Sequence, residues 1–318
     1  MSLLLAIDGT GENWSLKAWR RRFEARLAPA PVYVAGQDSY DRSAIHYAAV
    51  WRPQPGLLAA LPNLKVIFNL GAGVDALIAD KTLPDVPVVR IADDDLTGRM
   101  VEYVVLHVLF HHRRMPMLLE AQRRGDWSPK AQWAARSVRV GVMGLGVLGQ
   151  AAARHLGGIG FNVAGWSRTA RMVEGVECYH GPDGLAAFLA RTDILVVLLP
   201  LTAATRGILS TALFKKLARD GVLDGPVVIN AGRGGLQVED DILKALDDGT
   251  LGGVTLDVFE TEPLPQSSRL WSHPKAVLTP HNAADSDPEE ISDYVVRQMR
   301  NHMAGGALGN VVDRTIGY

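Results

Sequence analysis

Three ionisable residues in the last third of the chain carry complementary chemistry, and each follows a short apolar run that is typical of a β-strand. Arg233 comes after the first of these runs, Glu262 after the second and His281 after the third. Parallel strands bring their carboxyl ends, where ligands bind, to one edge of a sheet, so we expect the three side chains to converge. Each residue alone is explained as well by a structural role, as an arginine cap, a turn carboxylate or a buried histidine.

Together the three side chains supply what the reduction of a 2-oxo acid needs besides a hydride. An imidazole that titrates near neutral pH can give a proton to the new alkoxide. A neighbouring carboxylate favours the protonated form of the imidazole and orients its ring. A guanidinium grips carboxylate and carbonyl oxygens with a planar fork of donors. The set therefore predicts His281 as the acid and base, Glu262 as its partner and Arg233 as the substrate clamp.

A glycine-rich turn predicts the site of the hydride donor. Gly144, Gly146 and Gly149 follow the apolar run 138–143 and open a helix-compatible stretch at 150–156. In such a strand–turn–helix the first glycine allows the tight turn, the second lets the backbone approach a pyrophosphate and the third lets helix pack on strand. The phosphates then face free amides and the positive end of the helix dipole. We predict a dinucleotide site; an ordinary glycine-rich turn is the alternative.

The residues after the next apolar run, 161–166, indicate which dinucleotide is bound. An NAD-preferring site usually has an acidic residue there, which hydrogen-bonds the ribose hydroxyls and repels a 2′-phosphate. This chain has Ser167, Arg168 and Thr169 instead. A planar set of donors flanked by two hydroxyls suits a phosphate monoester. We predict NADP(H) as the cofactor, with NAD(H) as a weaker alternative; Arg168 as a solvated loop residue is the competing interpretation.

Composition limits the class of protein. With 318 residues, 47% of them hydrophobic, the chain can supply two cores. Its formal net charge of −1 gives no general attraction to nucleic acid or to an anionic membrane, and no apolar run is long enough to span a bilayer. Cys178 is the only cysteine, and the start of the chain is typical of a strand and not of a signal peptide. We predict a cytoplasmic protein with a small-molecule partner, no nucleic acid and no membrane.

One group of histidines has a spacing that could hold a metal ion. His107 and His111 lie at i, i+4 on a predicted helix, with His112 beside them. No cysteine or carboxylate completes a ligand set, and Arg113 and Arg114 follow directly. We predict no metal site.

The apolar runs predict strands that alternate with helices. Strands are expected at 3–7, 32–35, 47–51, 65–69, 88–90, 138–143, 161–166, 194–199, 227–231, 253–258 and 276–279. Helices are expected at 16–27, 97–124, 150–156, 184–189, 211–218, 239–248 and 288–304.

This order predicts an α/β fold with two doubly wound parallel sheets. A Rossmann dinucleotide-binding domain, residues 99–284, is inserted in a flavodoxin-like substrate domain made of residues 1–98 and 285–318. The last helix returns to the N-terminal unit. Closure of a cleft between the domains would exclude water from the hydride path.

The chain resembles the D-isomer-specific 2-hydroxyacid dehydrogenase family over nearly its whole length, and within it the short glyoxylate/hydroxypyruvate reductases. The resemblance rests on five segments in the family's order, which are GLGVLG at 144–149, LLPLTAATRGIL at 198–209, INAGRGG at 229–235, EDDILKALDDGTLGGVTLDVFETEPLP at 239–265 and LTPHNAA at 278–284. One departure is Gly232, where the family more often has alanine or serine before the arginine; this change would loosen the loop.

The resemblance implies roles for single residues. Arg233 would be the substrate arginine, Glu262 the carboxylate paired with the catalytic histidine, and His281 the acid and base. The loop 69–75 would hold the substrate carboxylate through backbone amides at Gly71, Ala72 and Gly73. Trp51 is similar to an aromatic residue near the substrate pocket, and packing in the core is the alternative for it.

The resemblance also implies a set of cofactor contacts, in which Asp257 meets the nicotinamide carboxamide and the segment 198–202 passes beneath the ribose. The set consists of Gly144, Gly146, Val147, Leu148, Gly149, Ser167, Arg168, Thr169, Leu199, Pro200, Ala231, Gly232, Arg233, Asp257 and His281.

The function implied by the resemblance is NAD(P)H-dependent reduction of small 2-oxo acids, glyoxylate and hydroxypyruvate, to 2-hydroxy acids by a homodimer. Two alternatives stay open. One is a non-enzymatic, dinucleotide-sensing protein of the corepressor type on the same fold, and the other is a reductase of larger 2-oxo acids such as phenylpyruvate. The presence of Arg233, Glu262 and His281 favours an enzyme, whereas the choice of substrate depends on loop shape, which the sequence does not reveal.

Overall fold

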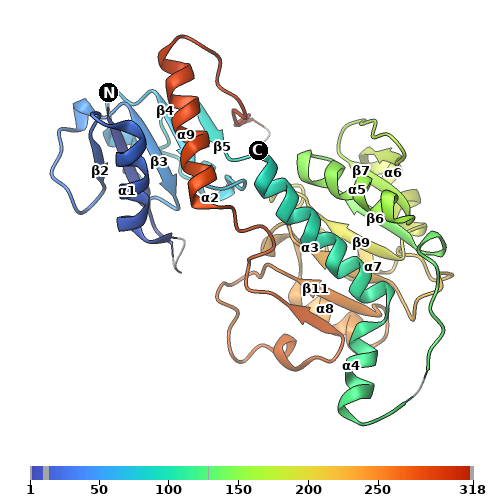
Figure 1. Ribbon diagram of the computed structural model, residues 1–318. Coiled ribbons are helices and arrows are strands. Elements are labelled where there is room, and N and C mark those ends of the chain that lie inside the picture. Colours follow the sequence, from blue (N-terminus) through green and yellow to red (C-terminus); the bar gives the residue numbers. More distant parts are fainter. Residues whose placement is uncertain (1, 10–13, 128, 316–318) are drawn as a thin grey trace. The chain divides into compact units, whose positions relative to one another are not determined.

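A computed structural model describes residues 2–9, 14–127 and 129–315 of the chain. The chain divides into two compact units, which we call unit 1, residues 1–96 and 285–318, and unit 2, residues 97–284. The chain passes from one unit to the other after Leu96 and after Ala284, compared with the predicted boundaries after Gly98 and Ala284. Each unit is built on its own sheet (Figure 1).

Unit 1 contains a five-stranded parallel sheet in the order β2-β1-β3-β4-β5. Its strands are β1 (Leu3–Ile7), β2 (Val32–Val34), β3 (Tyr47–Trp51), β4 (Val66–Asn69) and β5 (Val88–Arg90). In the middle of the sheet Leu5 is in register with Val34 on one side and Ala49 on the other. This is the strand order of flavodoxin-like folds, as predicted.

One face of this sheet is covered by two helices that lie far apart in the sequence. Helix α1 (Leu16–Leu27) and helix α9 (Pro288–Met303) pack against alternate strand residues because in a strand every second side chain points to the same face. The buried set on this face includes Trp19, Phe23, Leu27, Ile291, Val295 and Met299 from the helices and Leu3, Leu5, Tyr47, Ala49, Val66 and Phe68 from the strands.

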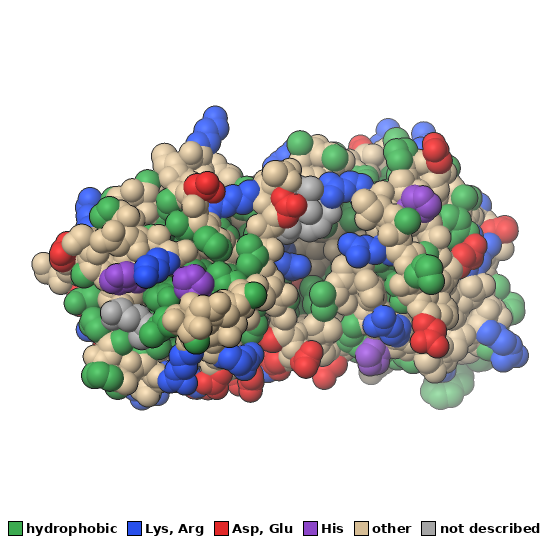
Figure 2. Space-filling model, turned by 90° about the horizontal axis from the view of Figure 1, so that it is seen from above, with side chains coloured by type: hydrophobic (Ala, Val, Ile, Leu, Met, Phe, Trp, Pro, Cys, Tyr) green, Lys and Arg blue, Asp and Glu red, His purple; other side chains and the backbone are tan. Residues whose placement is uncertain are grey.

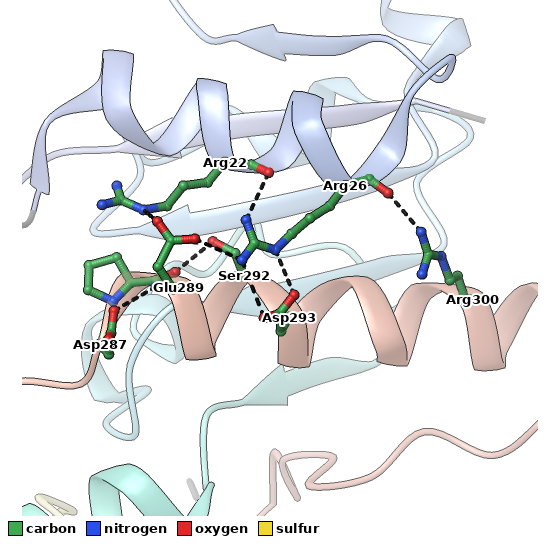
Figure 3. A network of polar contacts seen from close by, with 8 residues as sticks. Arg22, Arg26, Asp287, Glu289, Ser292, Asp293 and Arg300 are labelled. Atoms are coloured by element: carbon green, nitrogen blue, oxygen red, sulfur yellow. Dashed lines mark hydrogen bonds and ion pairs between the residues drawn. The ribbon is translucent and has the colours of Figure 1, made fainter.

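Ion pairs join α1 to α9 along their exposed sides (Figure 3). The Nε atoms of Arg22 and Arg26 lie 2.6 Å from Glu289 Oε1 and Asp293 Oδ1, respectively, and Arg26 Nη2 lies 2.8 Å from Glu289 Oε2. Hydrogen bonds from Arg26 and then Arg22 hold the pKa of Glu289 below its usual range. Arg300 adds a bond of 2.7 Å to the backbone carbonyl of Arg26. The network fixes the C-terminal helix on the N-terminal one.

The other face of the sheet of unit 1 is covered by short segments. They are the 3-10 helices η2 (Arg42–Ala44) and η3 (Leu58–Ala60) and the short helix α2 (Asp75–Ile78). Their apolar residues and those of the adjoining loops, Ile45, Leu58, Leu61, Leu64, Val74 and Leu77, pack on Leu4, Ala6, Ala48, Val50, Ile67 and Val88.

Unit 2 contains a seven-stranded parallel sheet in the order β12-β11-β10-β9-β6-β7-β8. Its strands are β6 (Arg139–Met143), β7 (Asn162–Ser167), β8 (Glu177–His180), β9 (Ile194–Val197), β10 (Val227–Asn230), β11 (Gly253–Leu256) and β12 (Ala276–Leu278). Counted from β6, this is the Rossmann order with one strand added at the β12 end, which confirms the predicted class. The edge strand β8 was not predicted, because its sequence Glu-Cys-Tyr-His forms no apolar run: its two end residues are exposed and its two middle residues only half-buried.

Helices cover both faces of the sheet of unit 2. Helix α3 (Asp94–His112) and helix α5 (Val147–Ile159) pack on one face, on which Val140, Val142, Val163, Val196 and Ile229 are buried. Helices α6 (Gly181–Ala190), α7 (Thr211–Phe214) and α8 (Glu239–Asp247) cover the other face. The 3-10 helices η4 (Ala135–Ser137), η5 (Gly234–Leu236) and η6 (Arg269–Ser272) lie in the connections.

The single helix predicted for residues 97–124 is wrong. Helix α3 ends at His112, and a separate helix α4 (Met115–Arg123) follows after Arg114, which has a left-handed backbone with φ 56°. The cause is Pro116 at the start of α4: in a continuous helix its ring would clash with the carbonyl group four residues earlier, and it offers no N–H.

The helix predicted for residues 211–218 is shorter in the structure and ends at Phe214. After it the amides bond three residues back, from Lys216 to Leu213 and from Leu217 to Phe214. The amide of Ala218 is taken by the carbonyl of Thr192, at 3.1 Å. Tertiary contact therefore ends this helix.

The surface carries charges of both signs. On the face drawn in Figure 2, basic and acidic side chains occur among apolar and neutral ones, in keeping with the formal net charge of −1. In the part of the chain that the structure describes, no helix is both long enough and apolar enough to cross a membrane.

Candidate active site

The glycine turn between β6 and α5 has the geometry that a pyrophosphate requires. Gly144 has φ +112°, and a Cβ there would lie 2.7 Å from the carbonyl oxygen of Leu198. A Cβ on Gly149 would lie 1.8 Å from the carbonyl oxygen of Gly144. At Gly146, by contrast, a Cβ would meet nothing within 4 Å. The two outer glycines are thus required by the fold itself, whereas the middle one leaves open space for a ligand.

The start of α5 faces that open space without a side-chain cap. Gly146 is its N-cap residue and Val147 its first residue, and both are exposed. The first amides of a helix have no partner within the helix, and together with the helix dipole they attract an anion. The residues present therefore fit a dinucleotide phosphate.

Ser167, Arg168 and Thr169 lie beside this turn. β7 pairs with β6, and the amide of Gly144 donates to the carbonyl of Trp166 at 2.8 Å, directly before the three residues. The hydroxyl of Ser167 donates to the carbonyl of Thr169 at 2.8 Å, and the side chains of Arg168 and Thr169 are exposed. Residues 167–169 thus supply one cation and two hydroxyls, and none of these three side chains is a carboxylate.

His281 and Glu262 meet in the structure. Nδ1 of the imidazole lies 2.7 Å from Glu262 Oε2, and the other carboxylate oxygen accepts the amide of Phe259 at 3.1 Å. Because an ionised carboxylate only accepts, Nδ1 carries the hydrogen of this bond, and Nε2 is the ring atom left for a ligand. The side chains are 36% and 25% exposed, so the pair is open to solvent on one side.

The backbone of His281 is held in an unusual conformation. Its φ is 55°, in the left-handed region that non-glycine residues seldom adopt. Its amide donates to the backbone carbonyl of Asp257 at 2.8 Å, and the carboxylate of Asp257 accepts the amides of Asn282 at 3.0 Å and Ala283 at 3.1 Å. Such a conformation persists only where its surroundings determine it. Here the end of β11 determines the loop that carries the histidine.

Arg233 lies on the loop after β10, the strand next to β11. Its side chain is half-buried, and Nη1 donates to the carbonyl of Gly232 at 2.7 Å. A Cβ on Gly234 would lie 1.8 Å from the carbonyl oxygen of Phe259, so the arginine loop packs directly on the segment that leads to Glu262. The loops that carry Arg233, Glu262 and His281 thus follow three neighbouring parallel strands at one sheet edge.

Gly232, the departure from the family pattern, is explained by close packing. A Cβ there would lie 2.8 Å from the carbonyl oxygen of Leu199 and 3.0 Å from the side chain of Leu236. The residue is buried, and its amide donates to Asn230 Oδ1 at 3.1 Å. The backbone approaches the segment 198–200 closely here, so the expectation of a looser loop is wrong.

The remaining predicted cofactor residues lie around the same edge. The amide of Ala231 donates to the carbonyl of Val197 at 3.2 Å, and the carbonyl of Pro200 accepts the hydroxyl of Thr205 at 2.7 Å. Leu199 directly precedes Pro200, and its carbonyl oxygen would lie 2.8 Å from a Cβ on Gly232. The carboxyl ends of β6, β7, β9, β10, β11 and β12 therefore bring the predicted cofactor residues of unit 2 together.

Trp51 and the loop of Gly71, Ala72 and Gly73, which are predicted to contact the substrate, belong to unit 1, where they form a cluster of their own. Asn69 Nδ2 bridges the carbonyls of Gly71, at 2.8 Å, and Gly73, at 3.0 Å, and so shapes the loop that includes Ala72. A Cβ on Gly71 would lie 2.3 Å from the ring of Trp51. Trp51 is half-buried and lies at the carboxyl end of β3, beside this loop.

Two neighbours of Trp51 were missed from the sequence. Trp14 stacks on it with ring centroids 4.8 Å apart, and the guanidinium of Arg52 lies 5.7 Å from the ring centroid. Arg52 has a left-handed backbone with φ 48°. Trp14 lies before α1 and outside any apolar repeat, so no sequence signal could have paired it with Trp51.

The histidines on α3 are packing residues. His111 Nε2 lies 2.9 Å from Thr255 Oγ1, and burial lowers the pKa of His111 to about 4. The ring of His107 packs against that of Tyr103 at a tilt of 51°, with ring centroids 4.3 Å apart, and burial lowers the pKa of His107 as well. Within residues 2–9, 14–127 and 129–315, no three His, Cys, Asp or Glu side chains are grouped so that they could hold a metal ion.

Comparison with known proteins identifies the family. The family described as D-isomer specific 2-hydroxyacid dehydrogenase, NAD binding domain, matches residues 105–283. A glyoxylate/hydroxypyruvate reductase A from Serratia proteamaculans is 39% identical over 311 residues, which make up 96% of this chain and 97% of that protein.

Solved structures agree with this match. The crystal structure of an NADPH-dependent glyoxylate/hydroxypyruvate reductase from Sinorhizobium meliloti, in complex with NADP and sulfate, is 44% identical with a TM-score of 0.93 and covers 100% of this chain and 99% of that one. A D-isomer specific 2-hydroxyacid dehydrogenase from Xanthobacter autotrophicus, in complex with NADPH and MES, is 40% identical with a TM-score of 0.92, with the same coverage. The resemblance found in the sequence is thereby confirmed, and the chain belongs to the D-isomer specific 2-hydroxyacid dehydrogenase family.

Proposed function

We propose that this protein is an NADPH-dependent reductase of small 2-oxo acids, with glyoxylate and hydroxypyruvate as substrates and the corresponding 2-hydroxy acids as products. The observation that carries the proposal is the 2.7 Å contact between His281 Nδ1 and Glu262 Oε2. It lies at the sheet edge that also holds the open glycine turn and the loop of Arg233. The proteins from Serratia and Sinorhizobium, named for this activity, support it.

In this mechanism each of the three side chains has one task. Arg233 binds the carboxylate and the carbonyl oxygen of the substrate and stabilises the charge that develops on that oxygen. His281 donates the proton on Nε2 to the same oxygen, while the bond from Nδ1–H to Glu262 fixes the ring. NADPH, when bound, supplies the hydride. Because the imidazole ends the step without the Nε2 proton, it takes up another from solvent on its exposed side.

The choice of NADP(H) rests on the corner after β7. Arg168 and Thr169 are exposed next to the glycine turn, and a guanidinium suits the 2′-phosphate that distinguishes NADPH from NADH. The complexes of the relatives from Sinorhizobium and Xanthobacter contain NADP or NADPH, which supports the same choice. NAD(H) remains the weaker alternative.

We assign the substrate carboxylate to the loop of Gly71, Ala72 and Gly73 and the limit on substrate size to Trp51. The loop is shaped by Asn69, and the indole fills the place where a side chain on Gly71 would stand.

The experiment that tests the proposal is the reduction of glyoxylate, hydroxypyruvate, pyruvate and phenylpyruvate with NADPH and with NADH, by the wild type and by His281→Ala. Removal of a positioned general acid should lower turnover roughly 10²- to 10⁴-fold while NADPH binding, measured by fluorescence titration, stays within about 2-fold. His155→Ala, at an exposed histidine on α5 whose Nδ1 lies 2.8 Å from the carbonyl oxygen of Ala151, is the matched control and should behave as the wild type.

Three outcomes would contradict the proposal. Absence of turnover with all four acids would favour the non-enzymatic dinucleotide sensor. Preference for phenylpyruvate would favour the reductase of larger acids. Retention of more than about half of the turnover in His281→Ala would exclude His281 as the proton donor.

We further propose that the protein works as a homodimer in the cytoplasm. Unit 2 exposes large apolar side chains on and after α3, namely Leu106, Trp127 and Trp133, which are 59%, 96% and 42% exposed. Exposed apolar groups of this size favour association. The single cysteine, Cys178, suits a reducing compartment. Sedimentation equilibrium at micromolar concentration should give twice the chain mass, and a monomer would contradict the dimer.

A further inference from the structure

A buried carboxylate behind the His281 loop is surrounded by hydrogen-bond donors. The side chain of Asp257 belongs to a residue that is only 2% exposed. Its Oδ1 accepts the hydroxyl of Thr279 at 2.6 Å and the amide of Asn282 at 3.0 Å, and its Oδ2 accepts the amide of Ala283 at 3.1 Å. A buried charge persists only when it is compensated in this way. The donors come from the two sides of His281, so the carboxylate ties both ends of the loop together.

The hydroxyl of Thr279 is itself held from α3. Tyr103 Oη lies 2.7 Å from Thr279 Oγ1. Because the single hydroxyl hydrogen of Thr279 goes to the carboxylate, which only accepts, Tyr103 must be the donor of the second bond. A directed relay results, from the Tyr103 phenol through the Thr279 hydroxyl to Asp257. Its two ends lie 154 residues apart in the chain, at positions 103 and 257.

The surroundings keep the phenol in the donor form and in place. Burial raises the pKa of Tyr103, and the nearby Asp257 carboxylate adds to the rise, so the phenol is protonated at neutral pH. One side of its ring is covered by the imidazole of His107, at 4.3 Å between centroids. Burial lowers the pKa of His107, so this ring is neutral there and brings no competing charge near Asp257. Tyr103 is therefore a fixed neutral donor on a helix packed against the sheet.

We propose that Tyr103 and Thr279 are positioning residues of the active site: their relay orients the Asp257 carboxylate, which through the amides of residues 282 and 283 fixes the loop that presents His281. Neither residue touches the reacting atoms. The inference rests on the proposed function and deepens it. If the imidazole of His281 is displaced by about 1 Å, the rate of the catalysed reaction can fall roughly 10²-fold.

The test uses Thr279→Val, which keeps the shape but removes the hydroxyl, and Tyr103→Phe, which removes only the phenol oxygen. We expect kcat with glyoxylate to fall about 10- to 100-fold in Thr279→Val and about 3- to 10-fold in Tyr103→Phe. KM for glyoxylate and the Kd of NADPH should stay within about 3-fold, since neither of the two substituted residues is a predicted ligand contact. Thr279→Ser, which restores the hydroxyl, should recover turnover to within about 3-fold of the wild type.

The matched control is Tyr47→Phe in unit 1. Tyr47 is also buried, and its hydroxyl also has a side-chain partner, His302 Nδ1 at 3.0 Å, but it lies on another sheet. This variant should lose stability comparably and keep its kcat. A loss of kcat in Tyr47→Phe as large as that in Tyr103→Phe would show a general effect of deleting a buried phenol and would overturn the inference.

A second measurement does not depend on activity. Amide hydrogen exchange over residues 279–284 should speed up at least about 10-fold in Thr279→Val and Tyr103→Phe but not in Tyr47→Phe, because the amides of 282 and 283 lose their fixed acceptor. Unchanged exchange in both relay variants, or unchanged kcat in folded Thr279→Val, would overturn the inference. If Thr279→Val does not fold, Tyr103→Phe decides by the same two criteria. If the wild type itself reduces no 2-oxo acid, the proposed function fails, and the exchange data alone decide whether the relay holds the loop.

Discussion

Replacing Glu262 by glutamine tests most sharply how the histidine is held. The carboxylate uses separate oxygens, Oε2 for His281 Nδ1 at 2.7 Å and Oε1 for the amide of Phe259 at 3.1 Å. A glutamine offers only one acceptor oxygen, so one of the two donors would face its NH₂ group. The lost bond is charge-assisted, which is worth about 1.5 to 3 kcal/mol, and because the side chains are 36% and 25% exposed we expect the lower half of that range.

At 1.36 kcal/mol for each factor of ten, kcat/KM should fall roughly 10- to 50-fold in Glu262→Gln. The assay follows NADPH absorbance with glyoxylate at several concentrations. Glu260→Gln is the control, because this neighbouring carboxylate accepts the amide of Glu239 and does not touch the histidine. In a double mutant with His281→Ala the substitution should have almost no further effect, since Glu262 acts through the imidazole. A loss of the same factor in both backgrounds would refute this reasoning.

Three further predictions concern the cofactor site and stability. Arg168→Ala should weaken NADPH binding by about 1.5 to 3 kcal/mol and leave NADH nearly unchanged in fluorescence titrations, whereas equal losses would make Arg168 a solvated loop residue. Gly146→Ala should keep the Tm within about 2 °C, because a Cβ there meets no protein atom within 4 Å, but should raise the Kd of NADPH at least about 10-fold by filling the space left for the pyrophosphate. Gly149→Ala, in contrast, should lower the Tm, because its Cβ would lie 1.8 Å from a backbone oxygen. Burial lowers the pKa of His111 from 6.5 to about 4, so the unfolded chain takes up a proton at this residue at a higher pH than the folded protein does. The free energy of unfolding, measured with urea, should therefore be about 2 kcal/mol smaller at about pH 5 than at about pH 7. His111→Gln should flatten this dependence, and an unaltered slope would assign it to other groups.

The elements that the sequence predicts well are those with a strong local pattern. Strands β1, β3 and β5 have the predicted bounds, because β1 and β3 are short apolar runs and β5 begins with Val-Val after a proline. The order of strands follows from the alternation with helices, since right-handed crossovers leave few topologies. Pro116 is a sequence signal for the break between α3 and α4. The apolar pattern continues on both sides of this proline, and it led to the wrong prediction of one continuous helix.

The site was predictable as a set of residues and not as a geometry. Arg233, Glu262 and His281 could be found because each follows a strand, and a parallel sheet fixes where strand ends lie. The left-handed backbone of His281 could not be found, because it depends on acceptors in Asp257 rather than on a local preference. The bond between Tyr103 and Thr279 joins residues 176 positions apart, and no spacing rule reaches that far.

The covering of one sheet face by both α1 and α9 bears on the order in which the chain can fold during its synthesis. Residues 1–96 leave the ribosome before unit 2, but the apolar face that includes Trp19 and Phe23 lacks the side chains of Ile291 and Val295 until α9 has followed unit 2. Unit 2 is continuous and closes its own core by residue 284. We therefore expect the inserted unit to fold first, while the N-terminal segment stays incomplete and exposed to chaperones, and the ion pairs of Arg22 and Arg26 with α9 to form as the last step of biogenesis.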